Sequence, residues 1–431
     1  MLLLTKYGVK VKSILFKILV LLLPVQLSKH FWPSWSYIFG IRLDYLSPVV
    51  YLTDILLFLL LSFWFIEKIA KTKPPEAFYK KRKTILAAAT ILLFSALNIA
   101  GAQSSQSALF EWLKLLEMIA LTLFVVENRE IITRESLFYP LSIATIYTAA
   151  IGVTQFFLQR TIGGPFYYLG ERTFSSSTPG IALGTYFGSQ LLRPYATFPH
   201  PNALAGFLVV SFLIFKDKKA ENLVDKVVKS LAAVCFLLLL FLSNSQGAWL
   251  VFLTCGFIYL LSKYRAILAR KAVFFLVILA TILSLVSPIL FQKFSSENTH
   301  LSEGVERRIS LAISSGKMIA ERPVFGVGLN NFLVALSQKG TRFDSAWFLQ
   351  PVHNIYLLVF AEAGLFGLFL FVYILTKALR NLYEKNKGVS FLMLSLLAIV
   401  LTGLFDHYWL TLQQTQLLFS IVLGFSLRRD G

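Results

Sequence analysis

The sequence predicts an all-α polytopic membrane protein with about twelve transmembrane helices and a long outer loop that carries an amphipathic helix. Hydrophobic residues make up 56% of the 431 residues and charged residues only 15%, and the mean hydropathy is +0.69. A soluble domain of this size does not have that balance. The apolar residues also gather in runs of about 20, the length that crosses a hydrocarbon core of ~30 Å. We therefore treat residues 1–431 as a single integral membrane domain.

The candidate spans are apolar runs, of which the third, sixth and seventh are the weakest. They lie near residues 12–28, 46–66, 84–100, 107–126, 137–158, 200–215, 229–243, 247–262, 272–291, 353–376, 388–404 and 411–427. The first run follows several lysines but lacks a small-residue cleavage motif, so we expect a retained span rather than a signal peptide.

The positions of Lys and Arg predict the orientation of these spans. If the N-terminus is cytoplasmic, the segments richer in Lys and Arg fall on the cytoplasmic side throughout, as the positive-inside rule requires. We therefore expect a multi-pass protein of the inner or plasma membrane with both termini in the cytoplasm. The net charge of +19 is divided among the connections between spans. It forms no single basic face, so we expect membrane lipids and no nucleic acid as partners.

Two outer segments, residues 159–199 and 292–352, are too long to be simple connections. The second contains Ile309, Ala312, Ile313 and Ile319 at helical spacing, and Pro323 follows them. This pattern predicts an amphipathic helix from about 307 to 319, which we expect to lie on the outer membrane face.

Polar residues at the outer ends of the spans are the candidates for chemistry. Arg193 precedes the sixth span, close to His200 and Asn202. A lone arginine there is commonly an interfacial anchor, but Pro194 and Pro199 make the segment after it rigid, and a fixed guanidinium can bind phosphate with two hydrogen bonds. The pair Arg307-Arg308 either contacts anionic lipid or neutralises a substrate diphosphate.

His353-Asn354 opens the tenth span. A histidine at a helix start is either a polar cap or, with a pKa of ~6.5, a proton acceptor at neutral pH. Glu362 lies nine residues later on another side of a helix, so we expect a buried polar link there rather than a dyad with His353.

Other polar residues stand near the last helices and within the fourth span. Asp406-His407, with nearby aromatic residues, predicts either an aromatic belt or the polar side of a pocket. Glu111, Lys114 and Glu117 recur every third residue, and their default interpretation is a structural ion cluster, with Asp54 a weaker case.

Several kinds of chemistry have no matching motif in this sequence. We find no metal-ligand pattern of His and Cys, no Walker loop and no acidic nucleotide-sugar motif, so we expect no metal and no cofactor. Gly326-Val327-Gly328 lacks the third glycine of a dinucleotide fingerprint and is interpreted as a turn. An outer-face enzyme without a nucleotide needs a substrate that is already activated, such as a lipid diphosphate.

At these residues the chain resembles the O-antigen ligase and Wzy-type polymerase superfamily, over roughly residues 190 to 425. Arg193-Pro-Tyr-Ala-Thr-Phe-Pro-His-Pro-Asn202 is similar to the family's arginine followed by Thr-Phe and His-Pro-Asn. Ser243-Asn-Ser-Gln246-Gly-Ala is similar to its Ser-Arg-Gly-Ala turn, with Gln246 in place of the arginine. Arg308, before the Pro-x-x-Gly-x-Gly turn, resembles the arginine of the outer helix, and Arg307 takes this role if the register shifts. His353-Asn354 resembles the family's His-Asn segment.

The resemblance implies a GT-C-like membrane fold and a metal-independent glycosyltransferase of polysaccharide biosynthesis in the cell envelope, with its active site on the outer face. The donor would be an oligosaccharide or polysaccharide linked to undecaprenyl diphosphate, and the acceptor a glycan, a lipid or a protein. By this analogy Arg193 and Arg308 hold the diphosphate, and His353 orients or deprotonates the acceptor hydroxyl. The residues predicted to contact substrate are Arg307, His200, Asn202, Asn354, Asp406 and His407.

Two alternatives stay open at this point. Ligase and polymerase differ only in the acceptor, and the residues do not distinguish them. The alternative from another class is a membrane permease or glycolipid flippase without catalytic activity. Such a protein should have polar residues at mid-membrane in several spans and broken helices. Here the polar residues cluster at outer ends, which favours the enzyme.

Overall fold

A computed structural model describes residues 2–71, 82–297, 303–338, 349–385 and 388–428. A helix falls on each predicted span, although the boundaries differ. These helices are α1 (Leu2–Leu21), α2 (Leu52–Lys71), α3 (Arg82–Ala100), α4 (Ser105–Glu127), α5 (Glu135–Leu158), α6 (Pro201–Lys216), α7 (Leu223–Ser243), α8 (Gln246–Tyr264), α9 (Ala266–Glu297), α12 (Ile355–Lys385), α13 (Phe391–Thr402) and α15 (Gln413–Leu427).

The helices differ in their capacity to cross a membrane. Within the described residues, five are long and apolar enough to do so by length and composition, namely α5, α7, α8, α9 and α12. Shorter apolar helices include α6 and α13, with 16 and 12 residues, against the ~20 that a perpendicular span needs. The mostly helical membrane fold is therefore confirmed, and a total of twelve spans stays a prediction.

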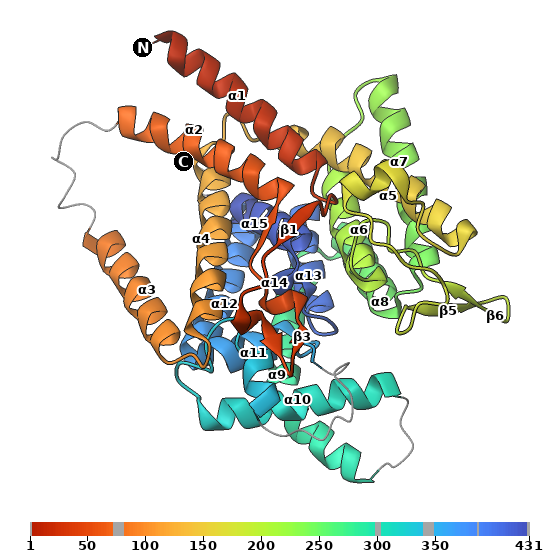
Figure 1. Cartoon of the computed structure of the whole chain (residues 1–431). Coiled ribbons are helices and arrows are strands. Elements are labelled where there is room, and N and C mark those ends of the chain that lie inside the picture. Colours follow the sequence, from red (N-terminus) through yellow and green to blue (C-terminus); the bar gives the residue numbers. More distant parts are fainter. Residues whose placement is uncertain (1, 72–81, 298–302, 339–348, 386–387, 429–431) are drawn as a thin grey trace.

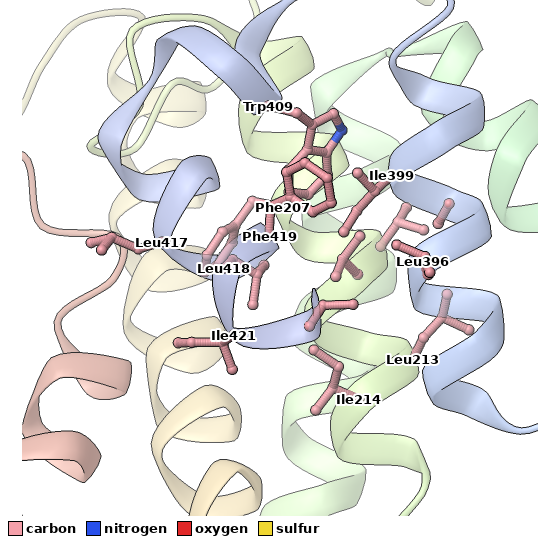
Figure 2. Packing of buried hydrophobic residues seen from close by; sticks show 14 of the residues in the cluster. Phe207, Leu213, Ile214, Leu396, Ile399, Trp409, Leu417, Leu418, Phe419 and Ile421 are labelled. Carbon is pink, nitrogen blue, oxygen red and sulfur yellow. The ribbon is translucent and has the colours of Figure 1, made fainter. Parts of the chain in front are cut away.

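The two short helices α6 and α13 form the centre of the bundle. Nearly every residue of α13 is buried, and α6 packs against α5, α7, α8 and α13. Figure 2 shows Leu213 and Ile214 of α6, Leu396 and Ile399 of α13, and residues of α15 in this core. The core reaches Trp409 of α14 (Tyr408–Thr411), whose Nε1 donates to Thr402 Oγ1 at 2.7 Å. The connection between α13 and α14 is thereby fixed at the end of the bundle.

The two ends of the bundle differ in character. Both termini lie toward the top of Figure 1, and α10 (Glu303–Glu321) crosses the bottom. At the terminal end, Lys68 pairs with Glu127 at 2.8 Å and Arg134 with Asp217 at 2.5 Å. The residues predicted to carry chemistry gather at the opposite end. This separation agrees with the alternation of positive charge, and the assignment of one end to the cytoplasm stays a prediction.

Short β-hairpins modify the predicted all-α class. β1 (Ser28–His30) pairs with β4 (Val49–Tyr51), β2 (Tyr37–Ile38) with β3 (Ile41–Arg42), and β5 (Leu183–Tyr186) with β6 (Ser189–Leu192), all antiparallel. The first pair explains why α1 ends at Leu21 and α2 starts at Leu52, since residues predicted at the edges of these spans form a ladder instead.

The predicted amphipathic helix is confirmed as α10, and it ends two residues before Pro323. Its buried positions include Ile309, Leu311 and Met318, and it packs on α9, α12 and the short α11 (Phe332–Gln338). Parts of the segment 292–352, including Lys339 and Arg342, lie outside the described residues.

Helix α12 is broken at Gly364, where φ is 66° and ψ is −168°. The turn formed by residues 323–328 packs against this break. Gly326 and Gly328 within the turn also have positive φ. Its backbone shares hydrogen bonds with α12 on both sides of the break: Val327 N to Ala361 O at 2.9 Å, Gly328 N to Glu362 O at 3.0 Å, and Leu365 N to Pro323 O at 2.8 Å. The glycine pattern was interpreted as a turn, and the structure confirms it.

Asn98 of α3 completes this junction. Its Nδ2 donates to Phe325 O at 2.8 Å and Glu362 O at 3.0 Å. Its Oδ1 accepts from Trp112 Nε1 and from Leu329 N, each at 3.0 Å. The side chain is 1% exposed and all its hydrogen-bonding capacity is used.

Two predictions about polar residues within the helices can be compared with the structure. Glu362 Oε1 accepts from Phe332 N at 3.0 Å, which confirms a polar link between α12 and α11. Lys114 Nζ lies 2.6 Å from Asp54 Oδ2 and 3.2 Å from Glu117 Oε2. The ion cluster is therefore confirmed for Lys114 and Glu117, with Asp54 of α2 as the shortest partner, and the ion pairs of the described residues do not include Glu111.

We predict that Gly364→Ala destabilises the protein by about 1–3 kcal/mol from backbone strain alone. A Cβ at this position would also overlap the Val324 carbonyl oxygen. The melting temperature of the full chain in detergent should fall. Gly256→Ala on α8 is the control, because a Cβ there meets no atom within 4 Å. Equal melting temperatures for the two variants would contradict a tight junction at Gly364.

Candidate functional site

Arg193 lies between β6 and α6, and two neighbouring helix ends hold its guanidinium. Nε donates to the Ser243 carbonyl at the end of α7 at 2.6 Å, and Nη2 donates to Asn202 Oδ1 in the first turn of α6 at 2.7 Å. Arginine has five N–H donors, so two contacts fix its plane while three remain for a ligand. This held geometry differs from that of a mobile interfacial anchor.

Gln246, which replaces the arginine of the family pattern, starts α8 beyond the turn that holds Arg193. Its side chain is exposed. The turn itself depends on Asn244, whose φ of 47° lies in the left-handed region that asparagine tolerates. The contribution of this turn to Arg193 is therefore the Ser243 carbonyl.

Arg308 is the member of the pair Arg307-Arg308 whose charge reaches the other candidate residues. The two side chains flank the buried face of α10 on opposite sides, since Arg307 shares a side with Met318 and Arg308 with Ala312. The pKa values of Arg193, His200 and His353 are all lowered, by burial first and also by the charge on Arg308. Arg308 is exposed and Arg307 is half-buried, and the choice of Arg308 for the site stays a prediction.

His200 caps the N-terminus of α6. Its Nδ1 accepts from Asn202 N at 3.1 Å, so the hydrogen of the neutral ring is on Nε2. Burial lowers the pKa of His200 to about 4, against the opposing charge of Asp406, and the ring is neutral at pH 7. The side chain is nevertheless accessible to solvent. Its Nε2–H is therefore available as a hydrogen-bond donor.

Asn354, not His353, caps α12. Its Oδ1 accepts from Tyr356 N at 2.9 Å and Leu357 N at 3.0 Å, and its Nδ2 donates to Ser284 Oγ at 2.9 Å. The alternative in which His353 is the polar cap is therefore wrong. Both ends of the Asn354 amide are thus bonded within the fold, and its contact with substrate stays a prediction.

His353 is left facing the connection between α13 and α14. Its ring centroid lies 5.3 Å from that of His407. Its Nδ1 is buried without a hydrogen-bond partner among the described residues. Burial lowers the pKa of His353, Asp406 opposes this, and the charge of Arg308 adds to it. The result is a neutral imidazole with an unused nitrogen.

Asp406 and His407 lie on that connection, which the Trp409 contact fixes. Burial favours the neutral acid, but the neighbouring His353, His407 and His200 outweigh it and lower the pKa of Asp406. Burial lowers the pKa of His407 to about 3. The pKa values of Asp406 and of these histidines therefore depend on one another's charge.

Sequence reasoning missed two contributors to this site. The ring of Tyr45 contacts that of His407 edge-on at a centroid distance of 5.6 Å, and its carbonyl accepts from Asn330 Nδ2 at 2.9 Å. The one feature of the sequence that could have pointed to Tyr45 is the aromatic-rich connection at residues 29–45. Thr411 Oγ1 lies 2.7 Å from His407 Nδ1 and had no signal of its own.

A separate cavity of about 330 Å³ lies away from these residues, between α1 and α5. Its lining includes Lys17, Leu21, Tyr139 and Ile143, so it is mainly an apolar groove on the side of the bundle. It contains none of the candidate residues, and we place the site at the helix ends.

The site combines two guanidinium groups from separate elements with neutral histidines and one carboxylate. Guanidinium groups suit phosphate oxygens, and a neutral imidazole suits a hydroxyl proton. The fold and these residues together define a membrane protein with several apolar helices and a cluster of guanidinium and imidazole groups at one end of its bundle.

Comparisons with known proteins agree with this class. The model of the family described as O-antigen ligase matches residues 231–372, which include α10 with Arg308 and the His353-Asn354 segment. The resemblance predicted from the motifs is therefore confirmed over this part of the chain. The chain is similar to the ComP-specific O-oligosaccharyltransferase of Acinetobacter baylyi, with 25% identity over 228 residues. That match covers 50% of this chain and 40% of the relative.

Proposed function

We propose that the protein is a metal-independent glycosyltransferase that transfers or polymerises a glycan from undecaprenyl diphosphate onto an acceptor hydroxyl in the outer leaflet. One observation carries the proposal. Arg193 and Arg308 lie within reach of each other's charge, and neither has an acidic partner among the described residues. Two like charges near one another repel. A diphosphate, with at least two negative charges, relieves the repulsion and uses both.

The reaction follows from this placement. The acceptor oxygen attacks the anomeric carbon of the donor sugar, and a new C–O bond forms as the bond to the diphosphate oxygen breaks. The leaving diphosphate takes the electron pair, and Arg193 and Arg308 neutralise its growing charge. The acceptor proton passes to His353, whose neutral ring is ready to accept it. The name of the Acinetobacter baylyi relative, an O-oligosaccharyltransferase, agrees with a hydroxyl acceptor.

Deleting the gene and analysing the surface glycan tests the function. Accumulated lipid-linked repeat units would identify a polymerase, and accumulated long lipid-linked chains a ligase. The acceptor of a ligase is then found by reconstituting the protein with this donor and with glycan, lipid or protein acceptors. An unchanged surface glycan and an unchanged lipid-linked pool would contradict both activities.

The permease or flippase alternative gains one supporting observation, the break in α12. Broken helices in transporters expose backbone groups to a substrate or ion. At Gly364 those groups are bonded instead to the 323–328 turn and to Asn98. The break therefore favours a fixed junction, and we retain the enzyme as the better-supported function.

We predict that Arg193→Ala and Arg308→Ala each lower kcat about 10²- to 10³-fold, because each removes donors that stabilise the leaving group. Arg193→Lys should also be impaired, since lysine cannot hold both the Ser243 carbonyl and Asn202. Release of undecaprenyl diphosphate by the reconstituted protein is the measurement. Lys317→Ala, an exposed change on the same helix as Arg308, should stay near the wild-type rate. Similar losses in all four variants would argue against a specific anion site.

The pH dependence of kcat/KM should depend on His353. The reaction needs the neutral ring, so activity falls as acidification protonates it. Because the pKa of His353 is lowered from its ordinary 6.5, the acid limb should lie below pH 6.5. Arg308→Gln removes a cause of that lowering and should move the limb upward. Asp406→Asn removes the opposing charge and should move it downward. Shifts in the same direction would contradict His353 as the base.

Because the proposed transfer uses no metal, we predict that a chelator leaves the rate unchanged. The reconstituted protein is dialysed against EDTA and assayed with and without added Mg²⁺. A loss of more than ten-fold that Mg²⁺ restores would contradict the mechanism.

A further inference from the structure

His353, Asp406 and His407 bring three metal-ligating side chains together from two segments. One ligand atom from each lies within 4.8 Å of the others. Asp406 and His407 have no step in the proposed transfer. His353 and Asp406 are partly accessible and His407 is buried. The group is thus accessible to solvent at His353 and Asp406 and buried at His407.

A hydrogen-bond relay fixes the tautomer of His407. The Thr411 hydroxyl donates to the His407 carbonyl at 3.2 Å, and Oγ1 lies 2.7 Å from His407 Nδ1. The tautomer that makes both contacts hydrogen bonds has Nδ1 as the donor to Oγ1. Nε2 therefore has its lone pair free. Metal-binding histidines are oriented in this way by a partner on the other ring nitrogen.

The free lone pair of His407 faces another acceptor. Nε2 lies 4.0 Å from Asp406 Oδ1, which is too far for a direct hydrogen bond. His353 Nδ1 is also buried without a hydrogen-bond partner among the described residues. Acceptors grouped in this way are stabilised by a cation between them. Zinc–ligand bonds of about 2.0–2.2 Å place two ligand atoms roughly 3–4 Å apart, which is close to the separation seen here.

We propose that His353, Asp406 and His407 form a site for Zn²⁺ with a fourth position open, and that Zn²⁺ bound there inhibits the protein by occupying His353. Two imidazoles and one carboxylate are a ligand set that suits zinc and does not suit the oxygen-seeking Mg²⁺ or Ca²⁺. The charges of Arg193 and Arg308 oppose a cation, so this site binds more weakly than a structural zinc site. The binding site stands without the proposed transfer reaction, and only the inhibition rests on it.

Calorimetric titration of the full-length, tag-free protein in detergent with Zn²⁺ tests the site. We expect one Zn²⁺ per chain and no matching heat with Mg²⁺. His353→Ala and His407→Asn should abolish binding. His30→Ala is the matched control, because His30 contacts Ser47 and stacks on Trp32, outside the group. Unaltered binding in the two site variants, or no binding by the wild type, would overturn the proposal.

Thr411→Val tests the relay without removing a ligand. Valine keeps the shape of the side chain but cannot fix the His407 tautomer, so Zn²⁺ affinity should fall about 10- to 100-fold. Co²⁺ provides a second readout. A tetrahedral Co²⁺ absorption spectrum should appear in the wild type and in His30→Ala and be lost in His407→Asn. The same Co²⁺ spectrum in His407→Asn would overturn the assignment of His407 as a ligand.

Inhibition is measured separately in the transfer assay. Zn²⁺ should inhibit at concentrations that match its binding constant, and a chelator should reverse the effect. Binding without inhibition would overturn the inhibitory role and the role of His353 in transfer, while the metal site would stand. Transfer by a wild-type protein that binds no Zn²⁺ would overturn the site and leave the proposed function intact.

Discussion

The backbone junction at the break in α12 is the constraint on which the predicted outer end of the molecule depends. A break in a membrane helix leaves N–H and C=O groups that lipid cannot satisfy. Here the 323–328 turn satisfies them from one side and the Asn98 amide from another. The turn follows α10 directly, so the junction also holds the C-terminal end of α10 in place. A change at Gly364 or Asn98 should therefore reach the site although neither residue lies in it.

The second organising feature is charge left without an acidic partner. Arg193 is held by neutral oxygens of Ser243 and Asn202, which position the guanidinium and do not neutralise it. Its positive charge stays available, and the charge of Arg308 adds to it. The histidines nearby are neutral because burial disfavours their charged forms. In the proposed function, the guanidinium groups bind the diphosphate and a neutral histidine accepts the proton.

The proposed zinc site and the proposed transfer both use His353, and the two uses are mutually exclusive. A His353 nitrogen whose lone pair binds a cation cannot take a proton from an acceptor hydroxyl. Asp406 and His407 are ligands in the proposed zinc site, whereas they take no direct part in the proposed transfer. The Thr411 relay is built into the short helix α14, which the Thr402–Trp409 contact ties to the core.

The sequence by itself determined the membrane class, the positions of the helices, α10 and the residue types of the site, because apolar run length and helical spacing are local properties. It also identified Arg193, His200, His353 and the Asp406-His407 pair as polar residues near helix ends. Only the tertiary structure decided which of them meet. Arg307 and Arg308 flank one buried face, so spacing alone could not choose between them. Asn354 rather than His353 caps α12. Tyr45, Thr411 and Asn98 were found only through their contacts in the fold, because contacts that depend on packing leave no local sequence pattern.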